Sequence, residues 1–266
     1  SSPNKIYHTS GNQPILVLCD DFNSYVCKYN RGLAGEATKL FHEIIGGSFA
    51  KLWKLAVPDF CFVNVNSEHI EEFYQLQPAF FRSPCFGSLF NDGVADVDEF
   101  YAKLSPASKS KFVNKINFFK IALFDIWIAN EDRNFNNYNL LIDIEQENQF
   151  IPIDHDSIFN TGNLDKGLVL LSDNESLIST EITSRLFTKK EIQSQNLVSH
   201  VKEEYYICIE NCKQNVDNIL NDIPTGWNVN KEKYKTLFNE QLFNKQWVDD
   251  CFKHFHKLIQ LKFLTT

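Results

Sequence analysis

The sequence lacks the features that mark a membrane, secreted or nucleic-acid-binding protein. No stretch approaches the roughly 18 consecutive apolar residues of a membrane-spanning helix. The first residues, Ser-Ser-Pro-Asn-Lys, have no apolar core of a signal peptide. Basic residues are outnumbered, with 26 Lys and Arg against 34 Asp and Glu, whereas non-specific binding of nucleic acid depends on basic patches. These absences predict a cytoplasmic protein that binds neither a membrane nor nucleic acid directly.

The cysteines do not form a disulfide framework. There are 7 of them, an odd number, scattered along the chain, which favours a reducing compartment. Cys208 and Cys212 lie one helical turn apart and could share a metal. No further His or Cys pair stands beside them at zinc-site spacing, so we interpret both as packed helix side chains.

The composition is that of an ordinary folded protein. The chain has 266 residues, of which 43% are hydrophobic and 23% charged, and this length suits one large domain or two lobes with separate cores. It contains no internal repeat. A turn signal at 91–93 precedes a change from β-rich to mainly helical sequence, so we predict an N-lobe over residues 1–91 and a C-lobe over 92–266.

The N-lobe pattern predicts a small sheet with a helix against it. Two short β-rich runs joined by turn residues predict a hairpin. A helical apolar pattern follows and is interrupted by Gly46-Gly47. The predicted elements are strands at 15–19 and 25–29, a helix over 33–45, a short helix at 49–55 and a strand at 60–65.

The C-lobe pattern predicts one deeply buried helix followed by a polar loop and a strand pair. Residues 112–129 are apolar around most of the helical circumference, which is typical of a helix inside a core. A polar loop then spans 130–138, and strands are predicted at 139–143 and 150–153. The rest, 176–263, reads as helical with a break at 223–227.

The residues that carry chemistry lie in this loop and strand pair. Asp132, Asn137 and Asp154 form the minimal set for kinase-type phosphoryl transfer: one Asp to accept the hydroxyl proton, and an Asn and a second Asp to hold Mg²⁺. Singly, Asp132 could be a solvated loop acid and Asp154 the cap of a turn. Their combination after a core helix favours the functional interpretation.

The N-lobe offers residues for the nucleotide phosphates. Lys28 lies in the second hairpin strand and Glu36 in the first turn of the next helix, which predicts a Lys–Glu pair. The polar turn before the hairpin contains Ser10, Gly11 and Asn12, and its backbone N–H groups could cover the phosphates. The alternatives are a solvated edge lysine and a glutamate that complements the helix dipole.

Three neighbouring polar residues are interpreted as structural. His155 resembles a metal ligand, but Mg²⁺ prefers oxygen, so we expect it to anchor the loop. Asn139 is expected to shape the loop through bonds from its side chain to the backbone. Arg133 is expected to pair with an acid that the sequence does not identify.

Taken together, the chain resembles a HipA-like kinase of the short type. The most specific matches are Asn-x-Asp-Arg-x-x-x-Asn-x-Asn-Leu-Leu at 130–141 and Ile-Asp-His at 153–155, with Ala-Val-Pro at 56–58 and Phe-Gly-Ser at 86–88 in support. Asn134 and Phe135 depart from the family, which often has His or Thr and then Pro there.

The resemblance implies a two-lobed α+β fold like that of protein kinases, with a small β-rich N-lobe and a larger, mostly helical C-lobe. It implies ATP and Mg²⁺ as cofactors, phosphorylation of Ser or Thr in a protein substrate, and a separately encoded antitoxin-like or scaffold partner. Asp132 would be the catalytic base, Asn137 and Asp154 the metal ligands, and Lys28 the phosphate-binding lysine. Ser10, or Thr9 beside it, would be the candidate for autophosphorylation.

Two alternatives from the residues stay open. One is a small-molecule phosphotransferase on the same scaffold, and the other is a nucleotide-binding pseudokinase or interaction module. Retention of Asp132, Asn137 and Asp154 favours an active enzyme, because a protein that only binds has no need of the base.

Overall fold

The structure is a computed structural model. It describes residues 2–6, 13–33, 35–70, 76–97, 112, 114–143, 145–146, 148–194 and 197–264. The turn predicted to cover the phosphates, with Thr9, Ser10, Gly11 and Asn12, lies outside the described residues.

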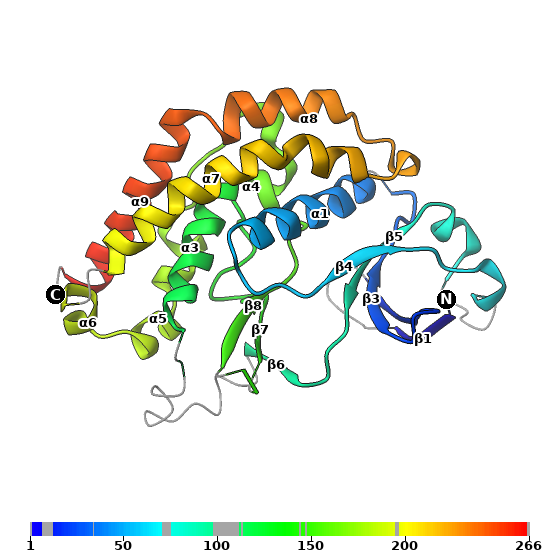
Figure 1. Ribbon diagram of the computed structural model, residues 1–266, viewed down its shortest axis with the longest axis horizontal. Coiled ribbons are helices and arrows are strands. Elements are labelled where there is room, and N and C mark those ends of the chain that lie inside the picture. Colours follow the sequence, from blue (N-terminus) through cyan, green and yellow to red (C-terminus); the bar gives the residue numbers. More distant parts are fainter. Residues whose placement is uncertain are drawn as a thin grey trace.

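An antiparallel sheet of five strands forms one end of the molecule (Figure 1). Its order is β1-β2-β3-β5-β4, and the predicted hairpin is confirmed by the pairing of β2 with β3, in which Ile15 faces Cys27. Buried side chains of this sheet, such as Val17 and Val63, belong to a small hydrophobic core. The strands are β1 (Ser2–Ile6), β2 (Ile15–Leu18), β3 (Ser24–Lys28), β4 (Phe60–Val63) and β5 (Cys85–Leu89).

Helix α1 (Glu36–Leu52) runs without a break through Gly46 and Gly47, so the predicted interruption and the separate short helix after it are wrong. The two glycines serve close packing instead. A Cβ on Gly46 would lie 2.4 Å from the Cβ of His155, and one on Gly47 would lie 2.8 Å from the ring of Phe60. Glycine is required here because other chain segments approach the helix backbone.

A second antiparallel sheet, of order β6-β7-β8, lies below the helical part of the molecule (Figure 1). Helix α3 precedes its hairpin in the chain and is buried on nearly every side, as its apolar sequence predicts. The elements are β6 (Val94–Asp96), α3 (Ile116–Ile128), β7 (Leu140–Asp143) and β8 (Gln149–Pro152).

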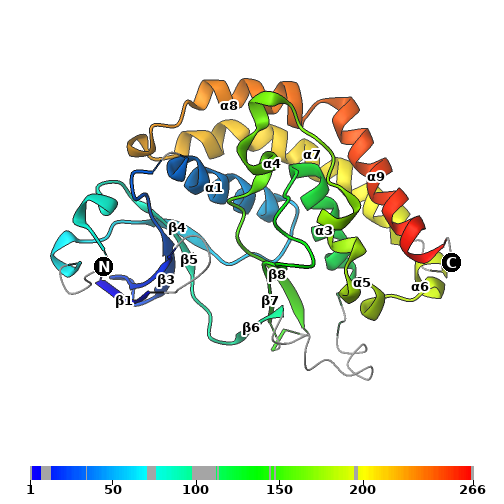
Figure 2. The same cartoon turned by 180° about the vertical axis from the view of Figure 1, so that it is seen from behind.

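The remaining chain is mostly helical, as predicted. Figures 1 and 2 show α7, α8 and α9 covering α1 and α3 on the side away from the sheets. The helices are α4 (Ile158–Gly162), α5 (Glu181–Leu186), α6 (Lys189–Ser194), α7 (Leu197–Asp222), α8 (Lys231–Leu237) and α9 (Lys245–Phe263). A π-helical turn, η8 (Phe238–Leu242), joins the last two. Shorter 3₁₀ turns are η1 (Ser67–His69), η2 (Pro78–Phe81), η4 (Leu164–Lys166), η5 (Asp173–Glu175), η6 (Leu177–Ser179) and η7 (Thr225–Trp227).

Helix α1 connects the two parts of the fold. It contacts β5 of the first sheet and also α7 and α4 of the helical part, and its buried side chains belong to the larger core. Cys208 and Cys212 are buried on α7 in that core. The lobe boundary at 91–93 joins β5 to β6 and stays a prediction. Of the helices in the described ranges, none combines the length and apolar character that crossing a membrane requires.

Candidate active site

A cavity of about 940 Å³ lies between the two sheets. Val26 and Phe86 line it from the five-stranded sheet, and Leu141 and Ile151 line it from the three-stranded sheet. Its polar lining includes Lys28, Glu43, Asn139 and Asp154. Apolar walls with a few convergent polar groups are typical of a small-molecule site.

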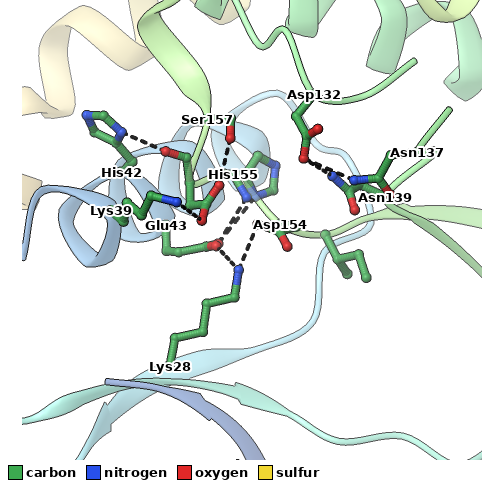
Figure 3. Close-up of polar contacts among 12 residues, drawn as sticks. Lys28, Lys39, His42, Glu43, Asp132, Asn137, Asn139, Asp154, His155 and Ser157 are labelled. Carbon is green, nitrogen blue, oxygen red and sulfur yellow. Dashed lines mark hydrogen bonds and ion pairs between the residues drawn. The ribbon is translucent and has the colours of Figure 1, made fainter. Parts of the chain in front are cut away.

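Lys28 joins the two lobes at this cavity. Its ammonium group donates to the carboxylate of Glu43 on α1 and, at 2.7 Å, to Oδ1 of Asp154, which follows β8 (Figure 3). The side chain of Lys28 is 14% exposed and that of Glu43 only 2%. The strand lysine is therefore held in the cavity between two acids and is not a solvated edge residue.

The predicted pairing of Lys28 with Glu36 is wrong. Glu36 instead accepts hydrogen bonds from the backbone N–H and the Nε of Arg31, each at 2.6 Å. Glu43 follows Glu36 by seven residues, which is about two turns, or roughly 10 Å along a helix. The packing of α1 places the turn that contains Glu43, and not the first turn, next to Lys28. The signal in the sequence is an acid within an apolar run, Leu40 to Ile45, where a charge needs a partner.

Burial and neighbouring charges shift the pKa values of Lys28, Asp154 and Glu43 in opposite directions. Burial alone would lower the pKa of Lys28, but Glu43 and Asp154 outweigh it, so the pKa is raised and the ammonium stays charged. Burial would raise the pKa of Asp154, yet the adjacent Lys28 ammonium turns the net shift downward. Burial raises the pKa of Glu43 although Lys28 opposes the shift. The charged ammonium of Lys28 therefore lies at the cavity beside an ionised Asp154.

The predicted catalytic loop, residues 130–138, begins where α3 ends. Ala129 adopts a left-handed conformation, φ 51°, and stops the helix. Asp132 then accepts hydrogen bonds on Oδ2 from the side-chain amides of Asn137 and Asn139, each at 3.0 Å (Figure 3). The sequence predicts a bond from the Asn139 side chain to the backbone, whereas in the structure its amide donates to the Asp132 carboxylate. Its nearness to Asp132 in the motif was the available signal.

The surroundings of Asp132 make it a better proton acceptor than an exposed carboxylate. Burial raises its pKa; the Asn139 amide opposes this shift, and the charge of Asp154 adds to it. A general base works best when its pKa moves toward the working pH.

Arg133 fixes the loop from inside the protein. Its guanidinium pairs with the carboxylate of Asp125 on α3 and donates to the carbonyls of Ile153, at 2.6 Å, and Asn139, at 3.3 Å. The expected acid is therefore Asp125. Because Ile153 immediately precedes Asp154, a single side chain ties the loop of Asp132 to the strand end that carries Asp154.

His155, the residue after Asp154, contacts α1 through its backbone N–H. Asp154 has a φ of 56°, a left-handed conformation that non-glycine residues adopt mainly where the surroundings impose it. The His155 N–H donates to Oε2 of Glu43 at 3.1 Å. The ring of His155 is buried edge-on to Phe124, and burial holds its pKa well below the ordinary value. Through these contacts His155 anchors the chain after Asp154 to α1 and α3.

The predicted metal ligands suit Mg²⁺ when phosphate oxygens complete its coordination shell. In the described ranges no three His, Cys, Asp or Glu side chains are grouped so that they could hold a metal ion. Asp154 would supply a carboxylate oxygen and Asn137 an amide oxygen, which are the hard ligands that Mg²⁺ prefers. Mg²⁺ usually completes its shell with waters and substrate phosphates, so two protein ligands fit this ion.

Comparisons with known proteins agree with this geometry. A sequence model described as HipA-like kinase matches residues 5–256. No curated protein matches the chain. The crystal structure of the proinflammatory kinase CtkA from Helicobacter pylori is 12% identical, covers 97% of this chain and 96% of its own, and gives a TM-score of 0.55. The open conformation of CtTel1 is 11% identical over 97% of this chain and 12% of its own, with a TM-score of 0.38, too low to show a shared fold. The likeness to CtkA confirms the predicted fold class.

Proposed function

The chain belongs to the HipA-like kinase family, and from this premise we propose that it transfers the γ-phosphate of ATP, with Mg²⁺, to the hydroxyl of a Ser or Thr in a protein. The observation that carries the proposal is the placement of Lys28. Its ammonium bridges Glu43 and Asp154 at the cavity between the lobes, where a nucleotide phosphate would meet a positive charge.

The apolar part of the cavity suits the nucleobase. Phe60 and Phe86 pack with ring centroids 5.7 Å apart and line the same cavity as Pro58 and Ile153. Flat apolar surfaces of this kind favour a planar aromatic ring, and the polar residues at one end fix its orientation. The triphosphate would then extend toward Lys28 and Asp154.

Each residue in the group has a distinct task in the transfer. Lys28 neutralises charge on the phosphates, and its raised pKa keeps it protonated. Asp154 and Asn137 would hold Mg²⁺, which supplies further neutralisation of phosphate charge when bound. Asp132 orients the acceptor hydroxyl and takes its proton. Catalysis would rest on positioning and charge neutralisation, as in other phosphoryl transfers.

The decisive test is Asp132→Asn, because the amide keeps the shape of the side chain and removes the base. We expect transfer of ³²P from γ-labelled ATP to fall by about 10²- to 10⁴-fold, with nucleotide affinity unchanged. Asp165→Asn serves as the control, because Asp165 is an exposed acid paired with Lys233 on the surface. Equal turnover by Asp132→Asn and the wild type would remove Asp132 from the mechanism.

The same assay identifies the acceptor class. A labelled protein band supports a protein Ser or Thr as the acceptor, and mass spectrometry would then show whether Ser10 or Thr9 is a site of autophosphorylation. Label found only in an added sugar, aminoglycoside or lipid head group would favour the small-molecule phosphotransferase. Nucleotide binding without Mg²⁺-dependent turnover would favour the pseudokinase.

A further inference from the structure

Element α4 contains a left-handed turn. Phe159, Asn160 and Thr161 have φ values of 60°, 50° and 55°, and Gly162 continues the turn with a φ of 82°. Left-handed backbone is unfavourable for residues with a Cβ, and consecutive residues rarely adopt it. Such strain persists only where surrounding contacts enforce it, and it gathers at functional sites.

Asn160 is the centre of the contacts that enforce this turn. Its backbone N–H donates to the carbonyl of Ala129 at 2.9 Å, at the start of the catalytic loop. Its side chain exchanges two hydrogen bonds with the backbone of Val169, at 2.9 and 3.1 Å. Its carbonyl accepts from the side chain of Asn163 at 2.6 Å. The turn is therefore connected to both the catalytic loop and the chain that follows it.

The carboxylate of Glu131, in the predicted catalytic loop, holds the turn through two hydrogen bonds. Its Oε1 accepts from the side-chain amide of Asn160 at 2.9 Å, and its Oε2 accepts from the hydroxyl of Thr161 at 2.7 Å. Its own carbonyl accepts from the side chain of Asn134 at 2.8 Å. Both carboxylate oxygens thus act on the strained turn, and the backbone of Glu131 is tied into the loop beside Asp132.

The turn also packs against α1, which carries the partner of Lys28. The ring of Phe159 contacts His42 edge-on, and a Cβ on Gly162 would lie 3.3 Å from His42 Cε1. The Nδ1 of His42 is 2.9 Å from the carbonyl oxygen of Asp156. The segment that leaves Asp154 is consequently held by α1 near its start and by Glu131 at its strained turn.

We propose that Glu131 is a positioning residue for phosphoryl transfer, because it clamps the left-handed turn 159–162 to the catalytic loop and so fixes Asp132 relative to Asp154. This inference rests on the proposed function, in which Asp132 takes the proton of the acceptor hydroxyl and Asp154 would hold Mg²⁺ in the same transfer. Glu131 itself need not touch the nucleotide. It acts through Asn160 and Thr161.

The test compares Glu131→Ala, Glu131→Gln and the double variant Glu131→Ala with Thr161→Gly in the full chain. Removal of the carboxylate frees the turn to relax, so we expect Mg²⁺·ATP turnover by Glu131→Ala to fall about 10- to 100-fold. ATP affinity should stay within about twofold, since Lys28 is untouched. Glu131→Gln keeps an oxygen acceptor for Asn160 and should retain part of the turnover.

The double variant separates clamping from other roles of the carboxylate. Glycine adopts left-handed backbone without strain, so Thr161→Gly should recover part of the turnover lost in Glu131→Ala although no carboxylate is restored. Hydrogen exchange gives a readout apart from activity. The amides of Asn160 and Val169 should exchange faster in Glu131→Ala, while the midpoint of thermal unfolding changes little.

Glu181→Ala is the matched control, because Glu181 is an exposed carboxylate on α5 that pairs with Arg185, and its turnover should equal that of the wild type. Unchanged turnover in Glu131→Ala would overturn the inference, as would a loss that Thr161→Gly does not reduce. Unchanged exchange at Asn160 and Val169 would overturn it too. A wild-type protein with no Mg²⁺·ATP turnover would instead remove the proposed function.

Discussion

The guanidinium of Arg133 and the carboxylate of Asp125 form an ion pair in the protein interior, with side-chain exposures of 0% and 1%. The pair connects α3, which carries Asp125, to the predicted catalytic loop, which carries Arg133. Arg133 also donates to the carbonyl of Ile153, the residue before Asp154. One buried pair therefore supports both the loop that carries Asp132 and the strand end that carries Asp154.

We expect Asp125→Ala to lower the free energy of unfolding by about 3–5 kcal/mol, because it leaves the Arg133 charge buried without its partner. Urea denaturation followed by circular dichroism measures this loss. Asp165→Ala breaks the exposed pair with Lys233 and should cost about 0–1 kcal/mol. A similarly small cost for Asp125→Ala would show that the buried pair does not hold the loop.

The corrected partner of Lys28 gives a second prediction. Glu43→Gln should lower turnover with saturating ATP by about 10- to 100-fold, because the Lys28 ammonium loses the carboxylate that orients it. Glu36→Gln should cost far less, since Glu36 contacts Arg31 and Leu33 on the loop before α1. Steady-state kinetics of both variants in parallel check this order.

The matched pair is informative because both residues are buried glutamates on α1, with exposures of 7% for Glu36 and 2% for Glu43. Each variant replaces a buried carboxyl group by an amide and keeps the side-chain shape. If Glu36→Gln reduced turnover as much as Glu43→Gln, the ion pair of Lys28 with Glu43 would not be the one that matters for transfer.

The parts of the site that the sequence predicted depend on local spacing. Asp132 and Asn137 lie in one loop, and their hydrogen bond spans only that loop. The hairpin of β7 and β8 places Asp154 just after the second strand. Polar residues at short separation after a buried helix can be interpreted directly, because few backbone paths connect them.

The parts that the sequence did not predict depend on how a helix packs against other segments. His155 approaches the backbone of α1 at Gly46, where no other side chain would fit. From the sequence alone, a pair of glycines predicts the end of a helix. The choice of Glu43 over Glu36 depends on which turn of α1 faces β3. Arg133 meets Asp125 because α3 is buried against the loop. In each case the partner is known only once the helix is packed against its neighbouring segments.

The third prediction concerns His42, which lies between α1 and the segment after Asp154. His42 is 2% exposed, and burial lowers its pKa to about 4 from an ordinary value near 6.5. The Asp156 carbonyl and carboxylate oppose the shift, and Lys39 adds to it. Between these two values the unfolded chain binds a proton that the folded protein does not.

The contribution of His42 to stability is therefore fully present above pH 6.5 and is lost as the pH falls toward 4. The shift predicts a loss of about 3 kcal/mol across this window. Other buried groups titrate there in the opposite sense: burial raises the pKa of Glu43 to about 7 and that of Asp125 to about 6. The pH dependence of the wild type alone would mix these effects.

The comparison with His42→Asn isolates the histidine, because asparagine keeps a donor near the position of Nδ1 for the Asp156 carbonyl and does not titrate. Urea denaturation of both proteins at pH 7 and pH 4.5 gives the two free energies of unfolding. We expect the wild type to lose about 2–3 kcal/mol more than the variant between these pH values. Parallel pH curves would mean that the folded protein protonates His42 as readily as the unfolded chain does, and that burial does not keep the ring neutral.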